Sequence, residues 1–260
     1  MLEKEWLNFA IELANESAGI VLEALQAQQG PDRQMKADRS FVTALDARVE
    51  RVLRERIADV YPSHGILGEE EEATQADADL VWVLDPIDGT AALIAGIPVF
   101  GTLIALLREG EPVLGILDLP ATQERWVGAR NSPTLYNGSP CHTRPCAALK
   151  DAFCSVSNPD FFNPQEARIL DAVRTSTAWR VWGGSCMSYG RLASGRTDVA
   201  FDTGLKIWDY AAFRPIIEGA GGVMTDWEGR PIHRDTGARI LAAGDPDRHR
   251  DMLRLIEMNS

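Results

Sequence analysis

Residues 80–90 read LVWVLDPIDGT, and this segment indicates both a core strand and a reactive site. The five apolar residues that open it predict a buried strand that stops at Asp85-Pro86. Asp85 and Asp88 are separated by only two residues, one of which, Ile87, adds a backbone carbonyl. Hard divalent cations bind carboxylate and carbonyl oxygens, so the strand end is a candidate metal site. The alternative is an Asp-Pro turn followed by a helix-capping aspartate.

The last two residues of the segment, Gly89 and Thr90, are typical of a turn into a short helix. The first backbone N–H groups of a helix lack intrahelical partners and point toward anions. We therefore expect the N–H groups of Gly89 and Thr90 to bind a phosphate oxygen beside the metal site.

Two further acidic positions lie at the ends of expected elements. Glu69 follows a short apolar run in Gly68-Glu69-Glu70, and Asp209 follows Trp208 at the start of an apolar helix. Alone, Asp209 is typical of a helix N-cap, and residues 69–72 are typical of a solvated acidic face. Carboxylates brought together repel one another, and bound cations provide the reason for gathering three such ends in one fold.

The flanking sequence predicts helices first and strands next. An amphipathic stripe predicts a helix over residues 5–27, and a T-x-x-D capping box at Thr43 and Asp46 opens a second helix. Strands at 99–107 and 113–119 flank Arg108–Glu111, which predicts a hairpin. A strand at 125–128 and a turn at Asn137-Gly138 complete the first half.

Beyond residue 145 strands and helices alternate. The expected strands are 152–157, 179–182, 198–202, 222–226 and 240–243, and the expected helices are 165–175, 185–194, 208–218 and 246–256. The fold class is therefore α+β followed by α/β. We expect an N-terminal half (1–145) with most of the metal ligands and a C-terminal half (146–260) with Asp209 and the substrate contacts, meeting at a cleft.

Composition excludes several classes of partner and mechanism. The net charge of −12 over 260 residues argues against nucleic acid and anionic membranes, which bind clustered Lys and Arg. No apolar run reaches the length of a membrane span and the N-terminus is not a signal peptide, so a cytoplasmic location is expected. The four cysteines form no CxxC pair, which disfavours zinc and a disulfide framework. A Ser hydrolase G-x-S-x-G and a P-loop are both missing.

Four motifs together resemble those of the inositol-monophosphatase superfamily. They are Lys36-Ala37-Asp38 with Val42-Thr43-Ala44-Leu45-Asp46, Gly68-Glu69-Glu70, Asp85-Pro86-Ile87-Asp88-Gly89-Thr90, and Trp208-Asp209-Tyr210-Ala211-Ala212. The resemblance covers essentially the whole chain. It implies a layered αβαβα sandwich and Mg²⁺-dependent, Li⁺-sensitive hydrolysis of a small phosphate monoester.

Other segments are most similar to the bacterial histidinol-phosphate phosphatases of that superfamily. They include residues 99–106, 124–128, 189–195, 204–206 and 219–229. One departure is Ala91, where those enzymes usually carry Lys after Gly-Thr. The alternatives are an inositol-1-phosphate phosphatase, a phosphoadenosine nucleotide phosphatase, and a non-catalytic regulatory binder on the same fold. The binder would be expected to have lost metal ligands, and all of them are present.

The resemblance also implies roles for individual residues. Glu69, Asp85 and the carbonyl of Ile87 would bind a first Mg²⁺, and Asp85 would bridge to a second ion held by Asp88 and Asp209. A third, weaker ion would rest on Glu69, with Asp46 reaching it through water. Thr90 would orient the attacking water and donate to Asp46, while Gly89 and Thr90 would hold the phosphate. For Asp46 the alternative is a plain capping residue.

The substrate side is assigned to two residues. Asp202, at a strand end, corresponds to the superfamily carboxylate that contacts the substrate alcohol, and its alternative is a strand-end turn residue. Because a carboxylate binds a cationic amine better than a neutral hydroxyl, Asp202→Asn would then impair histidinol phosphate hydrolysis selectively. Ser185 is expected to be a helix N-cap and a weaker substrate contact. A homodimer, with the Arg108–Glu111 hairpin as one candidate contact, is expected by analogy.

Overall fold

The computed structural model describes residues 2–26, 33–35 and 41–260. Within these ranges the helices are α1 (Leu2–Gln26), α2 (Ala44–Val60), α3 (Thr90–Ala95), α4 (Pro164–Ser176), α5 (Met187–Ala193), α6 (Ile207–Tyr210), α7 (Phe213–Gly219) and α8 (Pro246–Asn259). The strands are β1 (Arg33–Met35), β2 (Phe41–Thr43), β3 (Gly65–Gly68), β4 (Leu80–Asp88), β5 (Gly101–Arg108), β6 (Glu111–Leu119), β7 (Glu124–Ala129), β8 (Leu135–Tyr136), β9 (Ser139–Pro140), β10 (Phe153–Val156), β11 (Trp179–Trp182), β12 (Val199–Asp202), β13 (Val223–Asp226) and β14 (Ile240–Ala243). Lys36, Ala37 and Asp38 lie outside the described residues.

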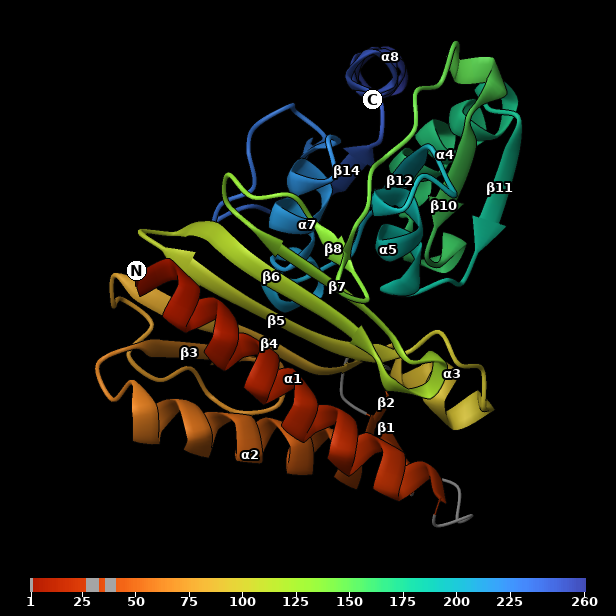
Figure 1. The fold of residues 1–260 in the computed structure, drawn as a ribbon. Helices are drawn as coiled ribbons and strands as arrows, with labels where there is room; N and C mark the ends of the chain where they lie inside the picture. The colour runs from red at the N-terminus through yellow and green to blue at the C-terminus, as the bar shows by residue number, and fades with distance from the viewer. Residues whose placement is uncertain (1, 27–32, 36–40) are drawn as a thin grey trace.

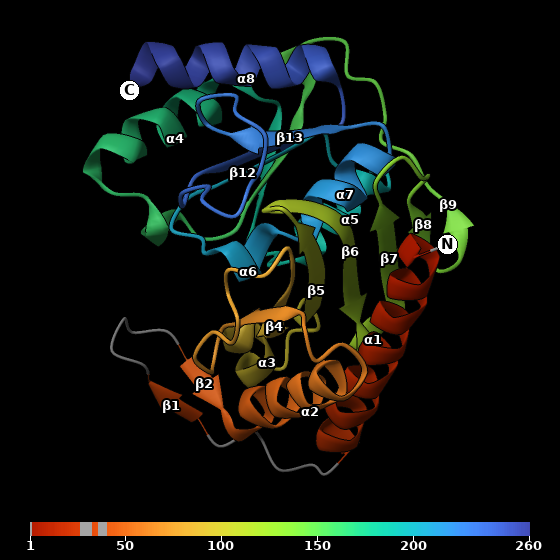
Figure 2. The same ribbon diagram turned by 90° about the vertical axis from the view of Figure 1, so that its left-hand side faces the viewer.

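The elements stack in five layers (Figure 1, Figure 2). Helices α1 and α2 form the first layer, the sheet of β3–β9 the second, and α5, α6 and α7 the third. The sheet of β10–β14 is the fourth layer, and α4 and α8 cover its outer face. The αβαβα fold implied by the resemblance is therefore confirmed.

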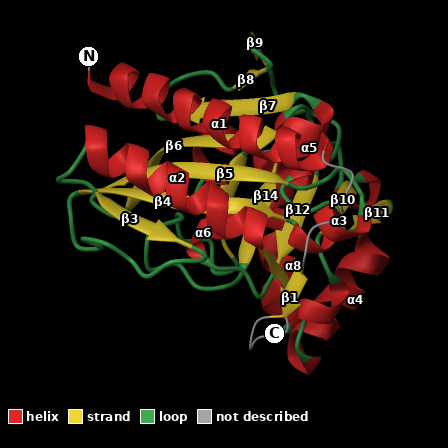
Figure 3. Ribbon diagram, turned by 90° about the horizontal axis from the view of Figure 1, so that it is seen from below, coloured by secondary structure: helices red, strands yellow, loops and turns green. Residues whose placement is uncertain are grey.

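The first sheet has the order β3-β4-β5-β6-β7-β8-β9. Helices α1 and α2 run side by side across one of its faces (Figure 3), where Leu13, Leu53 and Trp82 are fully buried together. Strands β3 and β4 are parallel, with Gly68 opposite Leu84, whereas β4 to β9 pair antiparallel. Because parallel strands end at the same edge, the residues after β3 emerge beside Asp85.

The second sheet has the order β11-β10-β12-β14-β13 and is mixed. The core between the two sheets draws on both parts of the chain, for example Leu103 and Leu117 from the first sheet and Tyr189 and Phe213 from the helices. The expected boundary at residue 145 falls between β9 and β10, in the connection between the sheets. The two halves thus have separate sheets and a shared core.

Strand β4 is longer than predicted, and its end is irregular. The prediction that it stops at Asp85-Pro86 is wrong, because Asp85 pairs with Leu103 and Asp88 with Gly101, with a register shift between them. Residues three apart on a regular strand face opposite sides, and one extra residue in a bulge restores them to one side. The bulge also accommodates Pro86, which has no N–H for the ladder.

The helix predicted over residues 208–218 is divided into α6 and α7. Ala211 and Ala212 keep helical dihedral angles, but Pro215 cannot donate to the carbonyl of Ala211. Strand β6 also comes very close here, since a Cβ on Gly115 would lie 2.0 Å from the carbonyl oxygen of Ala212. The short α6 therefore carries Asp209 as a separate turn above the first sheet.

The hairpin between β5 and β6 forms as predicted, and Gly110 at its tip contacts residues 233–234. The N–H of Arg234 donates to the carbonyl of Gly110 at 2.8 Å. The ring of His233 occupies the space that a Cβ of Gly110 would fill. Arg108, Glu109 and Glu111 of the tip remain exposed, and the dimer contact stays a prediction. Among the described helices, none is both long and apolar enough to cross a lipid bilayer.

Candidate metal centre and active site

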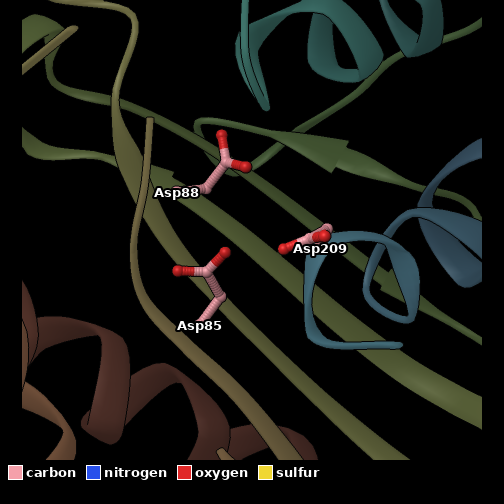
Figure 4. Close-up of side chains that lie close together, drawn as sticks. All are labelled: Asp85, Asp88 and Asp209. Carbon is pink, nitrogen blue, oxygen red and sulfur yellow. The ribbon is translucent and has the colours of Figure 1, made fainter. Parts of the chain in front are cut away.

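Three aspartates from two distant parts of the chain converge above the first sheet. Asp85 and Asp88 come from the bulged end of β4, and Asp209 comes from α6 (Figure 4). One carboxylate oxygen from each lies within 4.8 Å of the other two. Asp85 is 1% exposed, whereas Asp88 and Asp209 are half-buried, so the cluster has a closed inner end and a more open outer end.

The cluster carries more negative charge than its surroundings can stabilise. Burial, followed by Glu69, Asp88 and Asp209, raises the pKa of Asp85 well above its usual range. Burial is also the main cause that raises the pKa of Asp88 to about 6 and of Asp209 to about 8. Oδ1 of Asp85 is buried with no hydrogen-bond partner among the described residues. A buried, unpaired carboxylate oxygen amid other carboxylates fits a hard divalent cation.

Backbone donors orient two of the three carboxylates. The N–H of Cys186 donates to Oδ2 of Asp88 at 2.6 Å, and the N–H of Lys206 donates to Oδ2 of Asp209 at 2.5 Å. Each of these backbone N–H groups occupies only one oxygen of its carboxylate. Asp209 is the third residue of a capping box on α6 and not its N-cap, so the capping contact and a metal contact can use different oxygens.

Thr90 and Asp46 lie together as expected, although 44 residues separate them. Oγ1 of Thr90 lies 3.1 Å from Oδ1 of Asp46 and 3.0 Å from the carbonyl oxygen of Ile87. The other oxygen of Asp46 accepts from Thr43 Oγ1 at 2.5 Å and from the Thr43 N–H at 2.9 Å. Asp46 therefore serves the predicted capping box and the contact with Thr90 at once.

Glu69 lies near the three aspartates but outside the closest group of oxygens. It raises the pKa values of Asp85, Asp88 and Asp209, which places its charge beside the cluster. The parallel pairing of β3 with β4 explains this position, because both strands end at the same edge. The structure thus brings together Glu69, Asp85, Asp88 and Asp209, with the carbonyl of Ile87 beside Thr90.

Gly89 connects β4 to α3 with φ +83°, a conformation that favours glycine. A Cβ there would lie 2.8 Å from Oγ of Ser185, so Ser185 is directly beside the Gly89-Thr90 turn. The prediction that Ser185 is a helix N-cap is wrong. Helix α5 begins at Met187 after Cys186, and Ser185 has φ +43°. The Gly-Gly pair before Ser185 permits this tight turn, which hydrophobic periodicity does not reveal.

The predicted substrate contact of Asp202 stays a prediction, because both of its carboxylate oxygens already accept hydrogen bonds within the protein. Asp202 is 1% exposed. Oδ1 accepts from the N–H of Ser157 at 2.6 Å, and Oδ2 accepts from the hydroxyl of Tyr189 at 2.9 Å. Both oxygens are therefore used inside the protein, between β12, β10 and α5. This geometry favours the alternative of a structural strand-end residue.

One residue near the site has no counterpart in the sequence-based assignment. Glu50 is fully buried on α2, and its carboxylate accepts from the N–H groups of Glu70 and Glu71. The sequence does contain a signal for this position, because Glu50 follows Asp46 by four residues and so lies on the same face of the predicted helix.

Comparison with known proteins agrees with this geometry. Residues 2–257 match the family model described as the inositol monophosphatase family. The bifunctional phosphatase IMPL2, chloroplastic, of Arabidopsis thaliana is 41% identical over 85% of this chain and 67% of its own. A histidinol-phosphatase of Chlorobaculum parvum is 33% identical over 86% of both chains. An inositol monophosphatase from Zymomonas mobilis has a TM-score of 0.89 at 39% identity, covering 99% of each chain. The chain therefore belongs to the inositol monophosphatase family and is a phosphatase.

Proposed function

We propose that this protein is a Mg²⁺-dependent phosphate monoester hydrolase whose substrate is histidinol phosphate, in histidine biosynthesis. The observation that carries the metal-dependent chemistry is the buried, unpaired Oδ1 of Asp85 amid Asp88, Asp209 and Glu69. The 33% identity with a histidinol-phosphatase over 86% of both chains supports the choice of substrate.

The acidic cluster fits Mg²⁺, and we propose two ions with a third, weaker one. Glu69, Asp85 and the Ile87 carbonyl would hold the first ion, and Asp85, Asp88 and Asp209 the second, while Glu69 would hold the third. Bound cations supply charge stabilisation to the transition state and lower the pKa of the attacking water. The chain contributes the fixed orientation of these oxygens, through the Cys186 and Lys206 N–H groups. Li⁺ is proposed to inhibit by binding among the same carboxylates.

Thr90 is the residue placed to orient the nucleophile. When its hydroxyl proton points to Asp46, the lone pairs of Oγ1 are free to accept a hydrogen bond from a water molecule. The two Thr43 hydrogen bonds keep Asp46 in that position. The N–H groups of Gly89 and Thr90, at the turn into α3, would donate to the phosphate oxygens, and Ser185 lies beside that turn.

The second candidate function is hydrolysis of inositol 1-phosphate. The 39% identity with an inositol monophosphatase over the whole chain favours it. Ala91, in place of the Lys usual in histidinol-phosphate phosphatases, also leaves the substrate side of the turn open to another alcohol. Hydrolysis of a phosphoadenosine nucleotide is the third candidate and has no specific support from the site.

A substrate panel with the purified enzyme tests the proposal. Histidinol phosphate, inositol 1-phosphate and a phosphoadenosine nucleotide are compared with Mg²⁺, and with excess chelator. We expect the highest kcat/KM for histidinol phosphate and no phosphate release in chelator. Asp88→Asn controls for contaminating phosphatases and should lose at least about 100-fold, because it removes a ligand charge. Release that persists in chelator would overturn the metal-dependent mechanism, and poor turnover of histidinol phosphate would favour the inositol phosphate candidate.

Location and assembly are proposed by analogy with the family. We propose that the protein acts in the cytoplasm as a homodimer on a small phosphorylated metabolite, with no nucleic acid or membrane partner. Sedimentation at micromolar concentration tests the assembly, and the mass of a single chain would contradict it.

A further inference from the structure

Helix α2 carries a buried polar stripe made of Asp46, Glu50 and Arg54, spaced four residues apart. Asp46 and Glu50 are 0% exposed and Arg54 is 8% exposed. The apolar side of the same helix, with Leu53 and Ile57, packs in the first core. Because burying charged groups is costly unless they are paired and hydrogen-bonded, the stripe requires partners that use its charges.

Glu50 finds these partners in the loop that follows β3. Its Oε2 accepts from the N–H of Glu70 at 2.8 Å, and its Oε1 accepts from the N–H of Glu71 at 3.0 Å. Arg54 donates from Nε to Oε1 of Glu50 at 2.8 Å and from a terminal nitrogen to the carbonyl of Glu71 at 2.9 Å. The two amides bound by Glu50 are the two that directly follow Glu69.

The contact is tight on the other side of Glu69 as well. A Cβ on Gly68 would lie between 2.1 and 2.8 Å from the carboxylate atoms of Glu50. Gly68 is the last residue of β3, paired with Leu84 of β4, so the turn toward the aspartates starts there. The carboxylate of Glu50 thus touches the chain immediately before and immediately after Glu69.

We infer that Glu50, supported by Arg54, is a positioning residue that fixes the backbone of residues 68–71 and so directs Glu69 toward Asp85. One turn earlier on α2, Asp46 accepts a hydrogen bond from Thr90, the first residue of α3. Helix α2 therefore contacts two segments that border the metal centre, the loop after β3 and the start of α3, through carboxylates one turn apart. This inference rests on the proposed function in that the centre binds Mg²⁺.

Glu50→Gln tests the inference through direct Mg²⁺ binding. The side chain keeps its size, but its amide nitrogen cannot accept from an N–H group, so one contact to residues 70–71 or to Arg54 is lost. In calorimetry, we expect Mg²⁺ to bind the metal-free variant about 10–100-fold more weakly than the metal-free wild type. Losses of this size are typical when a residue that orients a metal ligand is replaced. The Mg²⁺ concentration for half-maximal activity should rise in parallel, with the KM for the phosphate ester nearly unchanged.

Asp198→Asn is the matched control for loss of a buried carboxylate. Asp198 is 2% exposed, accepts from Arg144 at 2.6 and 2.7 Å and from the N–H of Phe153 at 2.7 Å, and lies in the second sheet region. Its replacement should lower the melting temperature in chelator as Glu50→Gln does, but leave Mg²⁺ affinity within about twofold. If both variants bind Mg²⁺ as tightly as the wild type, Glu50 is only structural and the inference is overturned.

Gly68→Ala keeps the inference testable should Glu50→Gln fail to fold. It leaves Glu50 intact and displaces its carboxylate with one methyl group, so the same weakening of Mg²⁺ binding is expected. Unchanged Mg²⁺ affinity in Gly68→Ala would contradict the inference. Failure of the proposed function has a different result, namely a wild-type protein that binds no Mg²⁺ in calorimetry.

Discussion

At the scale of single residues, Asp85 is a buried carboxyl group with other carboxylates around it. Burial and the neighbouring carboxylates raise its pKa, and burial raises that of Asp209 from 3.8 to about 8. A carboxyl whose folded-state pKa exceeds its unfolded value contributes stability that is lost as the pH rises through the folded value. The metal-free protein should therefore lose stability between about pH 4 and 8. Because Asn cannot ionise, Asp85→Asn should raise the melting temperature at pH 8 in chelator.

The same substitution should reduce Mg²⁺-dependent turnover at least about 100-fold. Asp118→Asn is a matched comparison, because Asp118 is also buried with one unpaired oxygen but forms an ion pair with Arg125. That variant should lose stability in chelator and keep its activity. If metal-free Asp85→Asn has a lower melting temperature than the wild type, the charge of Asp85 is already compensated within the fold. Asp85 would then need no cation.

At the scale of elements, α5 links the metal centre to the second sheet. The N–H of Cys186, the residue before α5, donates to Asp88. One turn later, the Tyr189 hydroxyl donates to Asp202 of β12, and its ring stacks on that of Phe213 in α7 with the ring centroids 4.1 Å apart. We expect Asp202→Asn to reduce kcat/KM for histidinol phosphate and for a neutral-alcohol phosphate by the same factor, within about twofold. The reason is that both carboxylate oxygens of Asp202 already accept hydrogen bonds, from the N–H of Ser157 and from the hydroxyl of Tyr189 in α5.

Tyr189→Phe serves as the companion variant for this prediction. It removes the donor to Asp202 and leaves a buried oxygen unsatisfied, at a cost to stability of about 1–3 kcal/mol. Tyr189→Phe should also lower kcat/KM for histidinol phosphate and for the neutral-alcohol phosphate by the same factor. The opposite outcome is that Asp202→Asn lowers kcat/KM for histidinol phosphate alone, while Tyr189→Phe lowers it equally for both esters. That result would show that Asp202 contacts the substrate amine directly.

At the scale of the whole molecule, the two sheets share one core, and the metal centre joins residues from both halves. We expect a single unfolding transition in urea, coincident by circular dichroism and tryptophan fluorescence. Mg²⁺ at 100 times its dissociation constant should stabilise the entire protein by about 2.7 kcal/mol for each ion bound, because it binds the folded chain. Asp209→Asn should abolish the part of this shift that comes from the second ion. Two separated transitions, only one of them shifted by Mg²⁺, would show that the halves unfold independently.

The sequence by itself determined the features that depend on near neighbours. The capping box of Thr43 and Asp46, the turn at Gly89, the hairpin at Arg108–Glu111 and the acidic ends of β3 and β4 are all local patterns, since each involves residues a few positions apart. The motif resemblance then placed these ends in one centre, in a five-layered fold. The five-layered fold is confirmed, and Asp85, Asp88 and Asp209 lie close together, while their binding of metal stays a prediction.

Only the tertiary structure decided which side chains of each element face the metal centre. A register shift against β5 aligned Asp85 with Asp88, and Pro215 with the close approach of Gly115 divided the helix that carries Asp209. Asp202 is hydrogen-bonded by Tyr189, 13 residues away in the sequence, and Glu50 by the N–H of Glu70, 20 residues away. Burial and hydrogen-bond partners of this kind arise from packing between layers, and a linear pattern of residue types does not contain them.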